Sequence, residues 1–320
     1  MTNSWIDVCI AHKGREAEGI FSFDLVNAAD AELPPFEAGA HIDIRLPNGM
    51  TRQYSLCNSP DERSRYQIAL QREEAGRGGS ICLCDTVERG DVLRIGAPRN
   101  NFPLVTPARR SLLLAGGIGV TPMLAMVEVL WNRNAEFTLH YGARTRSRMA
   151  FTRRLAAAAF ADRVVLHLDD EPETRLDLAE AIGSPESDAH VYVCGPKGFI
   201  DAAMDTARSA GWSAPQLHFE LFSAAVEPRA DDGGFYVELA RSGGRVFIPP
   251  DKTVAEALDA AGVPIEVSCE QGICGTCLTR VLAGEPDHRD LFMNDEEHAR
   301  NDSFTPCCSR ARSAVLVIDR

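Results

Sequence analysis

Three of the chain's ten cysteines stand close together in its last quarter. The segment S-C-E-Q-G-I-C-G-T-C places Cys269, Cys274 and Cys277 within nine residues, and Cys307 and Cys308 follow further along. A single loop can therefore offer three thiolates to a metal centre, while a fourth thiolate arrives from another part of the fold. A local cysteine cluster in a large chain favours metal binding over a disulfide framework.

The C-x4-C-x2-C…C spacing matches the ligation pattern of plant-type [2Fe–2S] centres. Gly272 and Gly275 lie between the ligands, where they let backbone N–H groups approach and donate hydrogen bonds to the cluster sulfurs. Zinc is the competing interpretation, but structural zinc sites take cysteines in pairs, and only Cys307 or Cys308 is left as a second group. The pattern thus favours iron–sulfur over zinc or unrelated thiols.

A second group of residues could bind a nucleotide. Gly116, Gly117 and Gly119 interrupt the run L-L-L-A-G-G-I-G-V-T-P-M. The run is not G-x-G-x-x-G, but it can act in the same way: a strand ends, glycines make a tight turn, and a helix begins. We expect Thr121 to be the N-cap and Pro122 the first helical residue, so that a pyrophosphate can bind at the helix start. A plain strand–helix turn is the alternative.

The elements that must position these residues change character along the chain. Up to about residue 105, short strands at 41–46, 66–72 and 91–96 alternate with turn signals, which predicts an antiparallel β-barrel. Strand-like runs then alternate with helical segments, which predicts an α/β domain with a parallel sheet. These runs are residues 111–115, 137–141, 164–168 and 190–194.

A polar, turn-rich stretch precedes the cysteine region and indicates a linker. After it we expect a hairpin, then a short helix with Thr253 as N-cap, Glu256 three residues later and Gly262 as the stop. The predicted division is residues 1–105, 106–224, a linker at 225–233, and 234–320.

Composition excludes several classes of protein. The formal net charge is −13, which argues against a nucleic-acid partner. The longest apolar runs are too short to cross a bilayer, and the N-terminus lacks a signal-peptide pattern. We therefore expect a cytoplasmic protein with no membrane partner.

The final segment resembles a known family. The stretches F-Y-V-E-L, C-E-Q-G-I-C-G-T-C, G-E-P-D-H-R-D and C-C-S-R are similar to the C-terminal ferredoxin domain of the phthalate dioxygenase reductase family. The resemblance implies a plant-type ferredoxin domain of α+β (β-grasp) fold. It also implies that Cys307 is the fourth ligand, because the family's closing motif is C-x-S-R.

The resemblance further implies a flavin domain upstream. Arg52-Gln53-Tyr54-Ser55 is similar to the R-x-Y-S motif of ferredoxin reductases, in which Arg52 would pair with a flavin phosphate, Tyr54 would pack on the ring and Ser55 would reach N5. The family uses FMN rather than FAD. Further implied contacts of the flavin are Leu70, Gln71, the anion cradle Gly78, Gly79 and Ser80, and Thr121 and Phe222.

The same resemblance assigns the nicotinamide site. Cys194-Gly195-Pro196 would lie beside the nicotinamide, with Cys194 guiding hydride transfer, and Glu220-Leu221-Phe222 would end the domain with a ring that covers the flavin. The family favours NADH. Arg144, together with Arg146 and Arg148, would lie near the adenosine ribose, where arginines could instead hold the 2′-phosphate of NADPH.

The resemblance therefore implies an enzyme that passes electrons from NADH through FMN and a [2Fe–2S] cluster to a separate Rieske-type terminal oxygenase. A flavin must stand between a two-electron donor and a one-electron acceptor. The alternatives are a reductase of another acceptor, such as a cytochrome, and a redox-sensing or zinc-bound interaction protein without turnover. By analogy we expect a monomer.

Overall fold

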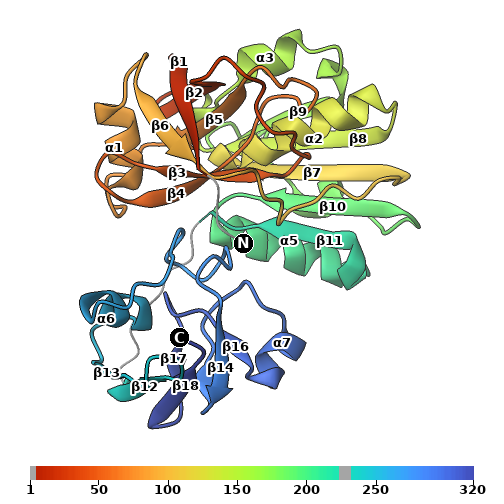
Figure 1. The fold of residues 1–320 in the computed structure, drawn as a ribbon. Helices are drawn as coiled ribbons and strands as arrows, with labels where there is room; N and C mark the ends of the chain where they lie inside the picture. Colours follow the sequence, from red (N-terminus) through yellow and green to blue (C-terminus); the bar gives the residue numbers. More distant parts are fainter. Residues whose placement is uncertain (1–4, 223–231) are drawn as a thin grey trace. The chain divides into compact units, whose positions relative to one another are not determined.

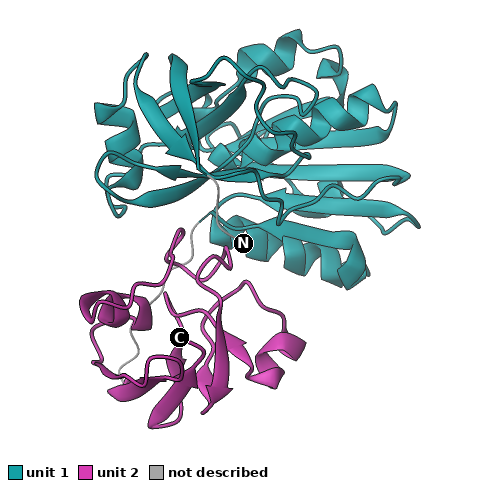
Figure 2. Cartoon of the chain, viewed as in Figure 1, with its two compact units in different colours: residues 1–222 teal, residues 223–320 magenta. Residues whose placement is uncertain are grey.

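The computed structural model describes residues 5–222 and 232–320, and the chain divides into unit 1, residues 1–222, and unit 2, residues 223–320 (Figures 1 and 2). The predicted linker at 225–233 lies outside the described residues except for Asp232 and Gly233. Unit 1 contains both of the predicted N-terminal domains, so a boundary at residue 105 stays a prediction.

Unit 1 begins with a barrel of six antiparallel strands in the order β4-β3-β6-β1-β2-β5. The strands are β1 (Ile6–Ala17), β2 (Ile20–Asn27), β3 (His41–Arg45), β4 (Thr51–Ser55), β5 (Tyr66–Gln71) and β6 (Val92–Ile95). A bridge between Leu56 and Ile68 connects the two ends of the sheet and closes it. Apolar side chains that alternate along the strands, such as Ile10 and Ile42, fill the interior. The helix α1 (Gly79–Thr86) follows β5.

The second part of unit 1 is a parallel sheet in the order β11-β10-β7-β8-β9 (Figure 1). Its strands are β7 (Arg110–Gly116), β8 (Glu136–Ala143), β9 (Val164–Leu168), β10 (Ala189–Cys194) and β11 (Leu217–Glu220). Its helices are α2 (Val120–Asn132), α3 (Thr152–Ala157), α4 (Leu178–Ile182) and α5 (Lys197–Ser209).

Both faces of this sheet are covered. Leu113 of β7 packs in the same cluster as α2, whereas its neighbour Leu112 packs with α5. A strand buried on both sides needs apolar residues at every position, which explains the run S-L-L-L-A. The carboxyl ends of β7 and β10 are neighbours, so the loops that follow them meet.

Unit 2 has its own core and a mixed sheet in the order β13-β12-β18-β14-β16. The strands are β12 (Phe235–Leu239), β13 (Arg245–Ile248), β14 (Thr279–Ala283), β16 (Ser303–Phe304) and β18 (Val315–Ile318), with the separate pair β15 (Pro286–Asp287) and β17 (Arg310–Ala311). Its helices are α6 (Val254–Ala260) and α7 (Asp295–Arg300).

Local sequence signals explain how α6 begins and ends. The Thr253 hydroxyl accepts a hydrogen bond from the Glu256 backbone N–H at 3.1 Å, and the Glu256 carboxylate accepts one from the Thr253 N–H at 2.8 Å. This is the predicted capping box. Gly262 follows the helix with a φ of +78°, which an L-residue adopts only under strain. The predicted hairpin is also confirmed, because β12 and β13 pair antiparallel.

Candidate functional site

The predicted cysteine ligands come together in unit 2. Cys269, Cys274, Cys277 and Cys307 are all buried. The Cys269 thiol lies within hydrogen-bonding reach of Cys274 and Cys307, and the Cys307 thiol reaches Cys277. None of the ten cysteines, all of which lie in the described residues, forms a disulfide.

The electrostatics of this group fit a bound cationic centre. Hydrogen bonds between neighbouring thiols lower the pKa of Cys269 and raise the pKa values of Cys274 and Cys307. Negative charge is thus stabilised on one sulfur at the expense of the others. A bound iron centre would remove this conflict, because it stabilises neighbouring thiolates together.

The backbone of the cysteine loop is arranged around the sulfurs. Gly272 and Gly275 have φ values of +71° and +70°. A Cβ on Gly272 would lie 2.5 Å from the Cys308 sulfur, so a larger residue does not fit there. The Thr276 N–H donates to the Cys274 sulfur at 3.4 Å, which is the kind of N–H···S contact predicted for the loop.

The adjacent cysteines 307 and 308 have different surroundings. The Cys308 sulfur lies 3.2 Å from the Thr305 hydroxyl and 3.8 Å from the Ser309 hydroxyl. The Cys307 thiol instead contacts two of the loop cysteines, Cys269 and Cys277. The geometry therefore distinguishes the two residues, which the spacing alone left open.

In unit 1, three predicted residues meet where β4, β10 and β11 end. Cys194 and Glu220 are register partners on neighbouring parallel strands. The Ser55 hydroxyl, on β4, donates a hydrogen bond to the Glu220 carboxylate at 3.2 Å. The barrel and the parallel sheet thus meet at this point, 165 residues apart in the chain.

This meeting point is poorly hydrated. Desolvation raises the pKa of Glu220 to about 8, although the hydrogen bond from Ser55 acts in the opposite direction. Desolvation, with a further contribution from Glu220, also raises the pKa of the buried Cys194 thiol. A carboxyl group that stays protonated near neutral pH can donate a hydrogen bond as well as accept one.

The glycines of the two nucleotide motifs allow their backbones to pack together. A Cβ on Gly119 would lie 2.2 Å from the Cys194 carbonyl oxygen, and a Cβ on Gly195 would lie 3.0 Å from the Gly116 Cα. Gly117 adopts a φ of +57°. The strand order explains this contact, because β7 and β10 are neighbours. Pro196 lies beside Gly116.

One local prediction is wrong. Thr121 is not the N-cap, and Pro122 is not the first helical residue, because α2 begins at Val120 with Gly119 as its N-cap. The 3₁₀ turn Gly117–Gly119 continues directly into the helix. The Thr121 hydroxyl donates to the Ile118 carbonyl oxygen at 3.0 Å instead of capping the helix.

The expected phosphate cradle lies at the start of α1. Gly78 is its N-cap with a φ of +84°, and a Cβ on Gly79 would lie 2.8 Å from Arg52 Cγ. The Arg52 side chain therefore lies across the helix start. Ser80 is one residue inside the helix, and its hydroxyl accepts a hydrogen bond from the Glu73 N–H at 3.0 Å.

The remaining flavin residues are less tightly grouped. Tyr54 is partly buried, and desolvation raises its pKa. The Leu70 side chain lies in the barrel core, whereas Gln71 donates to the Glu73 carboxylate at 2.5 Å. Phe222 is 37% exposed at the end of the described part of unit 1.

The three arginines after β8 differ in their ion pairs. Arg146 lies 3.5 Å from Glu171 and Arg148 lies 3.9 Å from Glu18. Arg144 is exposed immediately after the strand. Two of the three positive charges therefore have acidic neighbours.

Sequence reasoning missed one sulfur contact in unit 1 and one group of side chains in unit 2. The Arg52 guanidinium donates to the Met50 sulfur at 3.1 Å, a contact between residues two apart in the chain that we did not predict. In unit 2, His288, Asp290 and His298 gather into a cluster. Its first two members stand in the quoted segment G-E-P-D-H-R-D, but only the fold brings His298 to them.

Comparisons with known proteins agree with both units. Residues 113–205 match the oxidoreductase NAD-binding domain family, and residues 237–312 match the 2Fe-2S iron-sulfur cluster binding domain family. None of the described helices is long and apolar enough to cross a membrane.

Whole-chain relatives cover nearly every residue. A vanillate O-demethylase oxidoreductase of Pseudomonas putida is 51% identical over 98% of this chain and 99% of its own length. The solved structure of phthalate dioxygenase reductase, described as a modular structure for electron transfer from pyridine nucleotides to [2Fe–2S], matches with a TM-score of 0.79 and 38% identity. That match covers 99% of this chain and 98% of the other.

An intact type IV self-sufficient cytochrome P450 monooxygenase matches with a TM-score of 0.84 and 36% identity, over 99% of this chain and 41% of the larger one. The predicted fold class is thereby confirmed: a flavin barrel, an α/β nucleotide domain and a ferredoxin domain. The chain belongs to the phthalate dioxygenase reductase family of oxidoreductases, the flavin- and [2Fe–2S]-containing reductase components of oxygenase systems.

Proposed function

We propose that this protein is the NADH-dependent, FMN-containing reductase of a separate Rieske-type oxygenase that demethylates an aromatic methyl ether. The observation that carries the proposal is the meeting of Ser55, Cys194 and Glu220 beside the glycine motifs, in a chain that also gathers four cysteines. The name of the 51% identical relative supports the class of oxygenase.

Each group of residues has a part in this function. A flavin bound at this site would supply the conversion of two-electron transfer from NADH into one-electron transfer to the iron–sulfur centre. The Ser55 hydroxyl orients the Glu220 carboxyl, which holds a proton at its oxygen near neutral pH. The packed backbones of Gly119 and Cys194 would position the nicotinamide.

Arg52, with the start of α1 at Gly78, Gly79 and Ser80, would hold the single phosphate of FMN. Tyr54, Leu70, Gln71, Thr121 and Phe222 complete the flavin site, while Gly116, Gly117, Gly119, Pro122, Arg144, Gly195 and Pro196 bind the nucleotide. Cys269, Cys274, Cys277 and Cys307 hold the cluster.

We also propose the domain boundaries 1–105, 106–224 and 234–320, with a linker at 225–233. The protein would act in the cytoplasm as a monomer, without membrane or nucleic-acid partners. The net charge of −13 supports the absence of a nucleic-acid partner. A second acceptor class is a cytochrome, which the match to the self-sufficient P450 favours. Coupled turnover with a purified Rieske-type demethylase and with a P450 haem domain would decide between them.

An anaerobic absorption spectrum tests the electron path. We expect overlapping flavin and iron–sulfur bands that bleach on addition of NADH and only slowly with NADPH, and mass spectrometry should identify the released flavin as FMN. Preferential bleaching with NADPH would make the arginines after β8 a phosphate site. A colourless protein after reconstitution with flavin and iron would contradict the proposal.

Replacement of Gly119 by Ala tests the nicotinamide site. The added Cβ would meet the Cys194 carbonyl oxygen at 2.2 Å and push the two motifs apart. We expect flavin reduction by NADH to slow roughly 100-fold, as a displacement of about 1 Å can cause. Stopped-flow absorption measures this rate.

Gly142→Ala is the matched control, because its Cβ would meet only the Ala115 carbonyl oxygen, at an ordinary 3.7 Å. This variant should reduce its flavin at the wild-type rate. Equal rates for both variants would show that the backbone contact does not position the nicotinamide.

Serine substitutions test the fourth ligand. Cys307→Ser should lose most of its iron and the visible absorption of the cluster, because Cys307 contacts the loop cysteines. Cys308→Ser should keep both the iron and the absorption, since the Cys308 sulfur lies within hydrogen-bonding distance of the Thr305 and Ser309 hydroxyls. Iron analysis and absorption spectra measure the difference, and the opposite pattern would make Cys308 the ligand.

The raised pKa of Glu220 predicts a pH dependence of stability. The native carboxyl keeps its proton up to about pH 8, whereas the unfolded carboxyl loses it near its ordinary pKa of 4.5. Wild-type stability should therefore fall as pH rises through this range. Glu220→Gln removes the titration, so it should raise the melting temperature of unit 1 more at pH 7.5 than at pH 5.

Differential scanning calorimetry of the holoprotein measures this effect, with the exposed Glu136→Gln as the control for a simple loss of charge. If Glu220→Gln shifted the melting temperature equally at both pH values, Glu220 would not be a group that keeps its proton in the native state.

A further inference from the structure

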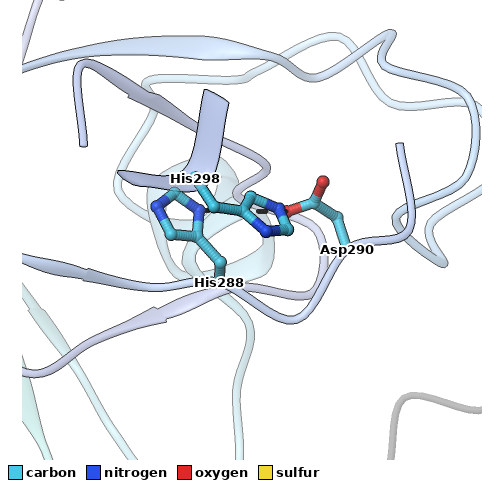
Figure 3. Close-up of side chains that lie close together, drawn as sticks. All are labelled: His288, Asp290 and His298. Atoms are coloured by element: carbon cyan, nitrogen blue, oxygen red, sulfur yellow. Dashed lines mark hydrogen bonds and ion pairs between the residues drawn. The ribbon is translucent and has the colours of Figure 1, made fainter. Parts of the chain in front are cut away.

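A cluster of two histidines and an aspartate lies in unit 2 and belongs to none of the sites described above. His288 follows β15, Asp290 comes two residues later, and His298 projects from α7 (Figure 3). One nitrogen of each ring and one carboxylate oxygen all lie within 4.8 Å of one another. Residues of these two types in one small volume are suited to a divalent transition metal.

The carboxylate of this cluster is held in place. Asp290 has a fully buried side chain, and its Oδ2 accepts a hydrogen bond from the Met293 N–H at 2.8 Å. Its Oδ1 faces the histidines and accepts a long hydrogen bond from the Ser309 hydroxyl at 3.5 Å. The aspartate therefore presents one oxygen to the imidazole rings at a fixed position.

His288 presents a nitrogen that needs a partner. Its side chain is only 10% exposed, and its Nε2 lies 3.1 Å from the Asn301 side-chain oxygen, which can only accept. In the neutral ring, Nδ1 is then a bare acceptor. This nitrogen is buried, has no hydrogen-bond partner among the described residues, and lies 3.9 Å from Asp290 Oδ1. Two electron-rich atoms thus face each other.

A cation between these atoms would resolve the conflict. Metal–ligand bonds of about 2.1 Å in a tetrahedral arrangement separate neighbouring ligand atoms by roughly 3.4 Å. Asp290 Oδ1 lies 3.3 Å from His298 Nε2 and 3.9 Å from His288 Nδ1, on either side of this value.

The surroundings resemble those of histidine ligands in general. A metal-bound histidine usually donates its other N–H to an oxygen that fixes the ring, and Asn301 is in the right place to accept that bond. Asn301 also ends α7 with a φ of +53°, while Asn294 caps the start of the helix. Both ends of the helix that carries His298 are therefore fixed.

Binding of an ion at this site requires the His298 ring to rotate. The two rings are stacked with centroids 4.5 Å apart and an interplanar angle of 19°, so their lone pairs do not yet converge. His298 is 25% exposed, which leaves room for its ring to tilt towards the ion and gives the ion a path from solvent.

We propose that His288, Asp290 and His298 form a binding site for Zn²⁺ or a similar borderline divalent ion, separate from the cysteine cluster. Two imidazole nitrogens and one carboxylate disfavour Mg²⁺ and Ca²⁺, which prefer oxygen ligands. Three protein ligands leave a fourth position for water. The site adjoins the cysteine loop, because the Leu291 N–H donates to the Gly272 carbonyl oxygen at 2.9 Å.

Calorimetric titration of the chelator-washed holoprotein with Zn²⁺ tests the proposal. We expect one saturable site per chain, with one zinc for every two irons by elemental analysis and an unchanged cluster absorption. His298→Gln should abolish this site while the cluster absorption reports that unit 2 is folded. Asn301→Gly, which keeps the left-handed backbone accessible, should weaken binding about 10- to 100-fold through loss of the ring's anchor.

Two histidine variants control for adventitious zinc. His12 is exposed on β1, and His167 belongs to another histidine pair, 3.0 Å from His140. Zinc affinity should be unchanged in His12→Gln and His167→Gln. The proposal is wrong if the wild-type protein shows no saturable binding or if His298→Gln binds zinc as tightly as wild type. The cluster would then be a hydrogen-bonded group that holds no ion.

Discussion

The contact between the Gly119 backbone and the Cys194 carbonyl oxygen is the constraint on which the reductase site of unit 1 depends. It leaves no room for a Cβ, and it exists because β7 and β10 are parallel neighbours. Cys194 is the register partner of Glu220 on the neighbouring strand β11, and Glu220 accepts a hydrogen bond from Ser55. One sheet edge therefore aligns the nucleotide loop with the end of β4 in the barrel.

The cysteine loop of unit 2 obeys a different constraint. The loop thiols of Cys269 and Cys274 compete for charge with that of Cys307, and the two glycines of the loop adopt left-handed backbone conformations. A bound cluster would offset these unfavourable features, so we expect its binding and local folding to be coupled. The Zn²⁺ site proposed next to this loop would use the same unit without sharing a ligand.

Much of this organisation could be predicted from the sequence because the signals are local. Alternating strands predicted the barrel, the apolar run before Gly116 predicted a doubly covered strand, and Thr253 with Glu256 predicted a capped helix. Individual contacts between side chains could not be predicted from spacing. No pattern indicates that Arg52 reaches the Met50 sulfur or that His298 joins Asp290. Thr121 does not cap α2, because a 3₁₀ turn leads directly into this helix. A helix that begins at a cap and a helix that continues a 3₁₀ turn start with similar residues, so the sequence did not distinguish them.

The division of the chain into two units has a kinetic consequence. Because both units belong to one polypeptide, the passage of an electron from flavin to cluster is a first-order event that dilution does not slow. A covalent connection corresponds to an effective concentration on the order of millimolar. Delivery to a separate acceptor is second-order and depends on the abundance of that acceptor. At low cellular concentrations of the acceptor, its supply would then limit the rate of electron delivery, whereas the transfer from flavin to cluster would not. Fusion of the acceptor to the same chain would abolish this dependence on concentration.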